Sequence, residues 1–379
     1  MAFEKTAGHR AGGHRARPRT RRRGPLYAAV DLGTNNCRLL IAAPSRAGFS
    51  VLDSHSQIAR LGEGLNSTGR LSDAAIDRAL DALRRISGKL KAKKVAHVRC
   101  IATEACRQAE NGPDFIERVR AETGLNFRII SSHEEARLAM VSCHDLIRPD
   151  ADHVLVVDIG GGSTEILLVD TRDLGDRPLQ GLLHRPAIRS VVSLPIGVVT
   201  LTEAFSHLEP DAATLAMREY ARSQVATWHQ ADQVRTLLSG RSGHIVGTSG
   251  TITCLTGVHL GLTRYRRDKV DGQWITHEAM MQVIEDLHRA GEAGRVAYPT
   301  IGLDRAPLMM AGCAIVEAVW SLAPEVPMRV GDRGLREGLL LTMMQGPKRR
   351  RTRRRRKGSS APGRAGDPQS GSEGGSHVG

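Results

Sequence analysis

A glycine-rich turn between two short apolar runs constrains the fold of this chain more than any other feature. The stretch 153–169 reads HVLVVDIGGGSTEILLV. The runs at 154–157 and 166–169 are rich in β-branched residues, which predicts two buried strands. The connection from Asp158 to Glu165 suits a wide hairpin, and its three glycines leave backbone N–H groups free to bind an anion. A glycine-rich hairpin that binds no ligand would show the same pattern. Other parts of the chain must therefore decide between an anion-binding hairpin and a purely structural one.

The same pattern occurs earlier in the chain. VDLGTNNCRLL, which contains Asp31, matches VDIGGGSTEIL, which contains Asp158, and the two aspartates are 127 residues apart. In both places a strand is followed by Asp, an apolar residue, Gly, a short small or polar segment and a second strand. An offset of about one domain length predicts a duplicated domain, with each copy presenting an Asp-Gly hairpin to a shared cleft.

Strands and helices alternate after the first hairpin. Ser72 is placed to cap a helix whose apolar residues recur at helical spacing. Strand-to-helix junctions follow at Thr103 and Ser131, and a third, Gly247–Thr251, follows a strand in the second half. This alternation predicts an α/β fold. The expected organisation is an α/β domain over 25–150, a second over 151–346, and a tail at each end (1–24 and 347–379).

The net charge of +14 is concentrated in the two tails. Residues 1–24 carry eight basic residues against one acidic, and residues 347–379 carry ten against two, so residues 25–346 are near neutral. Both tails have few apolar residues, which predicts disorder. The run RRRTRRRRK at 349–357 would bind a polyanion such as polyphosphate or RNA, although a solvated tail with weak nonspecific affinity has the same composition.

Cysteine use and hydropathy favour a cytoplasmic protein. The six cysteines form no CxxC pair and no zinc-ligand spacing with His, which is typical of reduced, buried thiols. The sequence contains no run of about 18 apolar residues, so no membrane span is predicted. The apolar region of a signal peptide is missing as well.

Three elements of the sequence are suited to holding phosphates. They are the two Asp-Gly hairpins and the segment Gly247–Thr251, and each directly follows an expected strand. Turns built only for packing are the alternative for each one. Arg38 and Arg107 are further candidates, because a guanidinium binds phosphate oxygens singly or in pairs. Arg38 alternatively is a strand-edge charge.

Two adjacent glutamates, Glu134 and Glu135, begin an expected helix. Adjacent helical side chains point about 100° apart, so at most one of them faces a cleft. Ser131 with Glu134, or Ser132 with Glu135, has the spacing of a capping box, which leaves the other glutamate free to act on water. A glutamate close to bound phosphates would suit a general base.

Asp158 and Glu165 are the best candidates for Mg²⁺ ligands, with Mn²⁺ as a substitute. Mg²⁺ prefers one or two carboxylates together with water and substrate phosphates. A charge at the end of a strand is the alternative for Glu165. The histidines show no metal or triad pattern.

An ordered set of motifs covering about residues 26–344 resembles the exopolyphosphatase / guanosine pentaphosphate phosphohydrolase (Ppx/GppA) family. The motifs are DLGTNNCRL from Asp31, ATEACR from Ala102, IISSHEEARL from Ile129, DIGGGSTE from Asp158, LPIGVV from Leu194, GTSGT from Gly247 and GDRGLREG from Gly331. The resemblance implies two duplicated actin-like domains of the sugar kinase–Hsp70–actin, ribonuclease H-like class, flanking a cleft, in the short two-domain form.

The resemblance also implies an activity and residue roles. The expected reaction is Mg²⁺-assisted hydrolysis of the terminal phosphoanhydride of inorganic polyphosphate, or of the 5′-γ phosphate of pppGpp, a nucleotide of the stringent response. Glu135 takes the catalytic position, and Asp158 and Glu165 the metal positions. The residues expected to bind phosphate are Asp31, Thr34, Asn35, Asn36, Arg38, Arg107, Gly160, Gly161, Gly162, Ser163, Thr164, Gly250 and Thr251. A homodimer is a possible assembly, and no membrane partner is expected.

Two positions depart from the family's usual pattern. Ser132 replaces a glycine before the glutamate pair, which predicts a tighter turn, and Thr200 replaces an arginine, which predicts a weaker phosphate contact. Two other functions stay open on the sequence alone. One is an ATP-dependent kinase or ATPase with an adenosine pocket near Gly247–Thr251. The other is a non-catalytic regulator that binds (p)ppGpp or RNA, against which the acidic residues at 135, 158 and 165 argue.

The C-terminal tail is expected to supply part of the affinity for long polyphosphate. Deleting residues 347–379 should weaken binding of long-chain polyphosphate at physiological salt, because the deletion removes ten basic residues. An unchanged affinity of the truncated chain in a binding titration would contradict this expectation.

Overall fold

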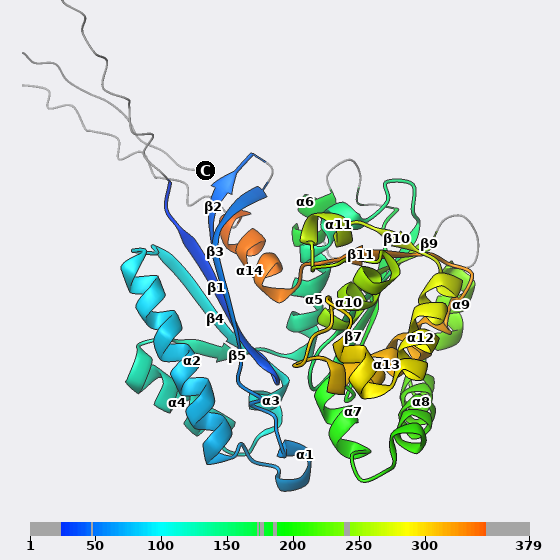
Figure 1. Ribbon diagram of the computed structural model, residues 1–379. Helices are drawn as coiled ribbons and strands as arrows, with labels where there is room; N and C mark the ends of the chain where they lie inside the picture. The colour runs from blue at the N-terminus through cyan, green and yellow to red at the C-terminus, as the bar shows by residue number, and fades with distance from the viewer. Residues whose placement is uncertain are drawn as a thin grey trace, which may run out of the picture. The chain divides into compact units, whose positions relative to one another are not determined.

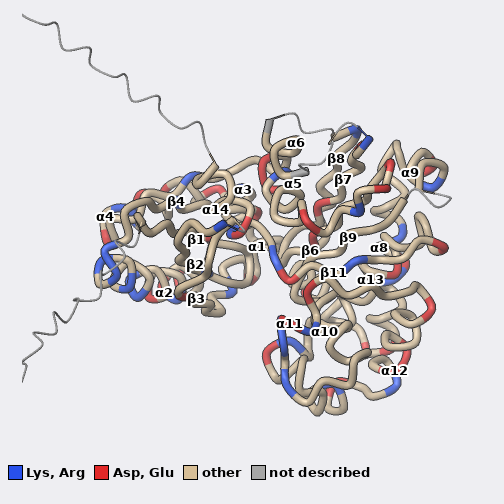
Figure 2. Tube along the Cα trace, turned by 90° about the horizontal axis from the view of Figure 1, so that it is seen from above, with Lys and Arg blue, Asp and Glu red and all other residues tan. Residues whose placement is uncertain are grey.

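A computed structural model of the chain describes residues 24–46, 48–172, 174, 178–184, 188–238 and 243–345. The predictions for the two basic tails concern residues outside these ranges, apart from Gly24. Residues 24–345 fall in one compact unit. Lys and Arg are interspersed with Asp and Glu along its helices (Figure 2).

The first half of the chain builds a five-stranded sheet in the order β3-β2-β1-β4-β5. β1 is antiparallel to β2 and parallel to β4, and β2 is antiparallel to β3. The strands are β1 (Tyr27–Leu32), β2 (Asn36–Ser45), β3 (Gly48–Ile58), β4 (His97–Ala102) and β5 (Phe127–Ile129).

Helices cover both faces of this sheet (Figure 1). Apolar side chains of α2 and α4 pack on one face of β1 and β2, and those of α5 and the last helix, α14, pack on the other. Ser72 caps α2 as predicted, since its Oγ accepts a hydrogen bond from the Ala75 N–H. The helices are α1 (Leu65–Thr68), α2 (Asp73–Ala92), α3 (Glu104–Gln108), α4 (Gly112–Thr123), α5 (Ser132–Ser142), the 3-10 turn η1 (His144–Leu146) and α14 (Leu335–Gln345).

The second half builds a six-stranded sheet in the order β10-β11-β9-β6-β7-β8. β6 is antiparallel to β7 and parallel to β9, and β7 is antiparallel to β8. The strands are β6 (His153–Ile159), β7 (Thr164–Asp170), β8 (Ile188–Leu194), β9 (Gly243–Thr248), β10 (Trp274–Ile275) and β11 (Met328–Gly331).

The two sheets repeat one topology. The order β3-β2-β1-β4-β5 corresponds to β8-β7-β6-β9-β11, with the same parallel and antiparallel pairings at every step. The sixth strand, β10, extends the second sheet alone. This repetition confirms the α/β fold with duplicated actin-like halves.

The remaining helices belong to the second half of the chain. They are α6 (Pro178–His184), α7 (Val198–Ala204), α8 (Pro210–Ala226), α9 (Ala231–Leu238), α10 (Gly250–His259), α11 (Arg267–Val270), α12 (His277–Val296), the 3-10 turn η2 (Ala306–Leu308) and α13 (Met309–Trp320). Within the described ranges, no helix is both long and apolar enough to cross a membrane. The domain boundary predicted at residue 150 falls between η1 and β6 and remains a prediction.

The second hairpin is tighter than the sequence predicted. β6 and β7 extend through Asp158 and Glu165, which face each other as register partners, and Ile159 pairs with Thr164. The turn therefore contains only residues 160–163, not 158–165. Three glycines in this turn permit the backbone to fold back sharply, since a Cβ at Gly160 would lie 2.9 Å from the Ser163 carbonyl oxygen.

α14 follows the last strand of the second sheet, packs on the first sheet and approaches α5 closely. Gly338 makes this approach possible, since a Cβ at that position would lie 2.0 Å from the Leu138 carbonyl oxygen of α5. The contact fixes α5, which carries Glu135, against α14, which carries Arg336 and Glu337.

Replacing either of two helical glycines by alanine should change the stability of the protein, in opposite directions for the two positions. Gly338→Ala should lower stability by about 1–3 kcal/mol, because an added methyl group overpacks the α5–α14 contact. Gly88→Ala in α2 should raise stability by about 0.5–1 kcal/mol, because no heavy atom lies within 4 Å of the new Cβ and alanine favours the helix. Calorimetric melting of both variants tests this, and stabilisation by Gly338→Ala would show that α5 and α14 are not in close contact.

Candidate active site

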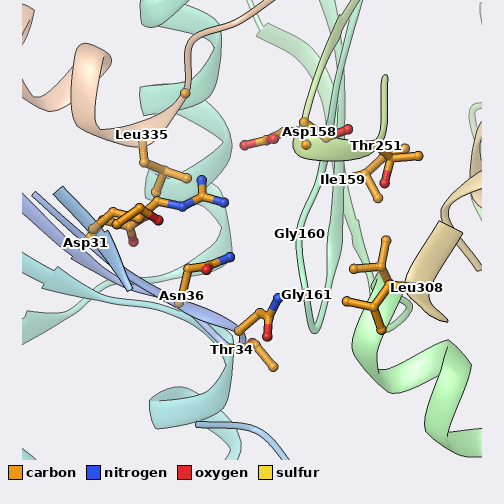
Figure 3. A pocket seen from close by; sticks show the side chains of 18 of the residues that line it. Asp31, Thr34, Asn36, Asp158, Ile159, Gly160, Gly161, Thr251, Leu308 and Leu335 are labelled. Atoms are coloured by element: carbon orange, nitrogen blue, oxygen red, sulfur yellow. The ribbon is translucent and has the colours of Figure 1, made fainter. Parts of the chain in front are cut away.

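The two hairpins, α10, α14 and the loop before η2 surround a cavity of about 900 Å³. Most residues predicted to bind phosphate, metal or water line it, although they come from positions 31 to 251. Asp31, Asn36 and Thr34 lie on one side, and Asp158, Thr251 and Gly160 on the other (Figure 3). The predicted site residues in the lining are Asp31, Thr34, Asn35, Asn36, Arg38, Glu135, Asp158, Gly160, Gly161, Gly162, Ser163, Glu165, Gly250 and Thr251.

The tips of the two hairpins touch each other. A Cβ at Gly161 would lie 3.1 Å from the Thr34 Cβ, and one at Gly162 would lie 2.7 Å from the Thr34 Oγ1. Larger residues at either glycine would force the two hairpins apart. The carbonyl oxygens of Gly160 and Gly161 also accept hydrogen bonds from the first N–H groups of α7. The glycine turn thus fixes the relative position of the two halves of the site.

Glu135, not Glu134, faces the cavity. Ser131 caps α5 by accepting a hydrogen bond from the Glu134 N–H at 3.2 Å, and the Glu134 carboxylate pairs with Arg128 away from the cavity. Glu135 is 6% exposed. Burial raises its pKa well above the usual range, the neighbouring Glu165 charge raises it further, and Arg107 opposes both.

Arg107 holds the Glu135 carboxylate in place. Its guanidinium donates to the Glu135 Oε2 at 3.1 Å and to the Ile130 carbonyl oxygen at 2.8 Å, and it forms an ion pair with Glu104. Arg107 is not among the residues that line the cavity, although Glu104 is. The structure therefore places Arg107 behind Glu135, where it orients that carboxylate.

Asp158 and Glu165 are neighbours on adjacent strands. Asp158 accepts a hydrogen bond from the Thr248 hydroxyl at 2.9 Å, and burial raises its pKa to about 6. Glu165 accepts from the hydroxyls of Ser163 at 2.7 Å and Ser193 at 2.8 Å. Burial raises the pKa of Glu165 to about 7, and the Asp158 charge adds to this rise. Each carboxylate retains its charge only at a cost, which a bound cation would reduce.

The carboxylates suit a divalent cation that keeps part of its hydration shell, rather than a metal ion held by protein ligands alone. Within the described ranges, no three His, Cys, Asp or Glu side chains converge on one metal position. Mg²⁺ does not need such a set, because water and substrate phosphates complete its coordination. Among the residues that the structure describes, the buried Oδ1 of Asp31, on the facing hairpin, has no hydrogen-bond partner. Asp31 therefore offers a third carboxylate at this cavity.

Asp31 and Arg38 act as a pair in the first hairpin. They are register partners on β1 and β2, and the Arg38 charge opposes the rise that burial causes in the pKa of Asp31. A carboxylate repels phosphate, so Asp31 would not contact phosphate directly. Arg38 or a cation would have to lie between them. Asn35 supports the tip of the hairpin, since its carbonyl oxygen accepts from the N–H groups of Ala59 and Arg60.

The third predicted element is the N-terminus of α10. Ser249 caps this helix by accepting from the Ile252 N–H at 3.0 Å, and Gly250 and Thr251 line the cavity. Space around Gly250 is open, since no heavy atom lies within 4 Å of an added Cβ. A helix N-terminus that opens into a cavity favours an anion.

Thr164, which was expected to bind phosphate, lies outside the cavity lining. Its hydroxyl donates to the Ile196 carbonyl oxygen at 2.7 Å, because side chains alternate along β7 and the next one, Glu165, faces the cavity. Thr200 does not line the cavity either; its hydroxyl accepts from the Gly197 N–H at 2.9 Å, and the weaker phosphate contact expected at this position remains a prediction.

The sequence did not indicate several charged residues of the cavity. These are Glu104, Arg267, Asp304, Arg305, Asp332, Arg333, Arg336 and Glu337. Four of them lie in the motif GDRGLREG, whose position between a strand and a helix matches the other phosphate elements and was a usable signal. Arg305 has no such signal, because it lies in an irregular loop far from any glycine-rich strand end.

Several solved structures share the fold of this chain. A member of the Ppx/GppA protein family from Aquifex aeolicus is 28% identical, with a TM-score of 0.68 over 84% of this chain and 97% of that one. An exopolyphosphatase-like protein is 28% identical, with a TM-score of 0.69 over 84% and 97%. An exopolyphosphatase from Cytophaga hutchinsonii, at 23% identity, shares the fold with a TM-score of 0.73 over 85% and 98%.

The Ppx/GppA phosphatase family model matches residues 40–346, which include the second hairpin, the glutamate pair, α10 and α14. This match covers most of the chain. It includes every segment that lines the cavity except the first hairpin. The chain therefore belongs to the Ppx/GppA phosphatase family.

Proposed function

We propose that this chain hydrolyses phosphoanhydrides, releasing the terminal phosphate of inorganic polyphosphate or the 5′-γ phosphate of pppGpp. Glu135 takes a proton from the attacking water, the new P–O bond forms on the terminal phosphorus, and the bridging P–O bond breaks. The shortened phosphate chain leaves as the anion. Membership of the phosphatase family and the similarity to exopolyphosphatases support this reaction class.

The observation that carries the proposal is the environment of Glu135. Its carboxylate is buried, held by Arg107 and placed on a cavity whose other walls are glycine turns and a helix N-terminus. A raised pKa suits a general base that works near neutral pH, since the deprotonated carboxylate is then basic enough to accept a proton.

Mg²⁺, or Mn²⁺ in its place, would be held by Asp158 and Glu165 together with substrate oxygens. Bound there, the ion would supply positive charge against the phosphate oxygens. The glycine turn at 160–162 and the start of α10 would hold the phosphates through backbone N–H groups. We further propose a cytoplasmic location, which the six free, buried cysteines favour.

Glu135→Gln should abolish most phosphate release while leaving the fold intact. Loss of a general base lowers turnover by roughly 10²–10⁴-fold. The measurement is initial-rate phosphate release from long polyphosphate, tripolyphosphate, pppGpp and ATP, side by side, which also ranks the substrates. Turnover of ATP above that of the other three would favour an ATPase or kinase instead.

Glu134→Gln is the matched control for this variant. Glu134 precedes Glu135 on the same helix but pairs with Arg128 outside the cavity, so its loss should leave turnover within about twofold. Full activity of Glu135→Gln, or equal losses in both variants, would contradict the role given to Glu135.

Glu165→Gln should stabilise the protein at pH 8 in EDTA but not at pH 5. The folded-state pKa of Glu165, about 7, exceeds the ordinary value near 4.3 of an unfolded chain. Stability from this group is therefore fully present below about pH 4 and is lost as pH rises through about 7. Glutamine avoids that loss, on the order of 3–4 kcal/mol, and its oxygen still accepts from the serines.

Melting temperatures of the wild-type protein and of Glu165→Gln, measured in EDTA across pH 5–8, test this prediction. Glu285→Gln, on the exposed surface of α12, is the control for the amide substitution and should change the melting temperature little at any pH. A melting temperature of Glu165→Gln that is unchanged or lower at pH 8 would mean that Glu165 is not a buried, repelled carboxylate.

A further inference from the structure

Glu104 lines the cavity but has no part in the reaction proposed above. It is the first residue of α3, two positions after the end of β4. Its side chain is 13% exposed, and its Oε1 accepts a hydrogen bond from the Gln108 amide at 2.5 Å. A carboxylate in the wall of an anion-binding cavity repels phosphate, so Glu104 lowers the affinity for substrate unless its charge is compensated.

Arg107 compensates the charge of Glu104 with only half of its guanidinium. The Arg107 Nη2 forms an ion pair with the Glu104 Oε2, while the Nη1 donates to the Glu135 Oε2 at 3.1 Å and to the Ile130 carbonyl oxygen at 2.8 Å. Each terminal nitrogen therefore contacts a different carboxylate. Two ionised carboxylates outweigh one guanidinium, so a phosphate is attracted by Arg107 only if one of the two ion pairs opens.

The position of Glu104 is fixed by its own helix and by the second hairpin. Glu104 and Arg107 are three residues apart on α3, a spacing that places both side chains on one helix face. A Cβ at Gly162 would lie 3.1 Å from the Glu104 Cγ, so the glycine turn passes close to this side chain. Glu104 is therefore next to both the turn expected to hold phosphate and the arginine that orients Glu135.

We propose that Glu104 is a positioning residue that holds the Arg107 guanidinium on Glu135 and withholds its charge from bound phosphate. The inference rests on the proposed function for the role of Glu135 as general base. It implies that this chain gives up part of its affinity for substrate in favour of turnover, because Arg107 orients the base instead of binding the substrate's ground state.

Glu104→Gln should lower kcat and KM together. Glutamine keeps the size of the side chain next to Gly162 but has no charge, so Arg107 can turn from Glu135 toward phosphate. Initial rates of phosphate release from tripolyphosphate should show a kcat about tenfold lower, because the base is less well oriented. KM should fall roughly fivefold, because Arg107 then adds a charge-assisted contact to phosphate. A defect of folding or packing would lower kcat without lowering KM.

Orthophosphate titrations distinguish a released Arg107 from reduced charge repulsion. Orthophosphate has no anhydride bond, so calorimetry at physiological salt measures its affinity for the full chain without turnover. Glu104→Gln should bind it roughly fivefold more tightly than the wild-type protein does. When Arg107→Gln is present in both proteins, the same substitution should change the affinity by less than about twofold, because the gain depends on Arg107.

Glu110→Gln is the matched control for the loss of a carboxylate. Glu110 lies two residues after the end of α3, and its exposed side chain pairs with Arg70 outside the cavity. Its substitution should leave kcat, KM and the orthophosphate affinity within about twofold of the wild-type values.

Two results would overturn the role given to Glu104. One is a Glu104→Gln variant whose kcat is within twofold of wild type, or whose KM does not fall. The other is a gain in orthophosphate affinity that persists with Arg107→Gln, since simple relief of repulsion would then explain it. Failure of the proposed function looks different, because wild-type protein would then release no phosphate while the Arg107-dependent gain in orthophosphate affinity was still observed.

Discussion

The burial of like charges around one cavity is the constraint on which the site depends. Glu135, Asp158 and Glu165 come from three different elements. Burial raises the pKa of each carboxyl group, and a neighbouring carboxylate raises it further. Arg38 lines the same cavity, and burial and the Arg336 charge lower its pKa. Such an arrangement lowers stability unless a ligand compensates both sets of charges, as the proposed oligophosphate with its cation would do.

The scaffold holds these charges together through close backbone contacts. Gly161 and Gly162 let the tips of the hairpins meet at Thr34, and Gly338 lets α14 approach the helix of Glu135. α14, the last helix described, packs on the first sheet, so residues about 300 positions apart in the sequence line the same cavity. Packing at three glycines thus determines the electrostatics of the site.

Much of this could be predicted from sequence because the signals are local. The repeat of the Asp-Gly hairpin indicated the duplicated fold, helical geometry allowed at most one of the two glutamates to face the cavity, and the family resemblance assigned that position to Glu135. Side-chain direction was less accessible: Thr164 lies in the motif, but strand alternation turns it away. Arg305 could not be predicted, because its loop reaches the cavity through tertiary packing, which includes the contact with Cys254.

The most direct test of the central claim is the fate of solvent oxygen. Wild-type protein turns over polyphosphate in water enriched in ¹⁸O, and mass spectrometry follows both products. Attack of water on the terminal phosphorus predicts one ¹⁸O in each released orthophosphate and none in the shortened chain. Label in the shortened chain, or phosphate release that requires an added acceptor, would contradict a hydrolase that activates water at Glu135.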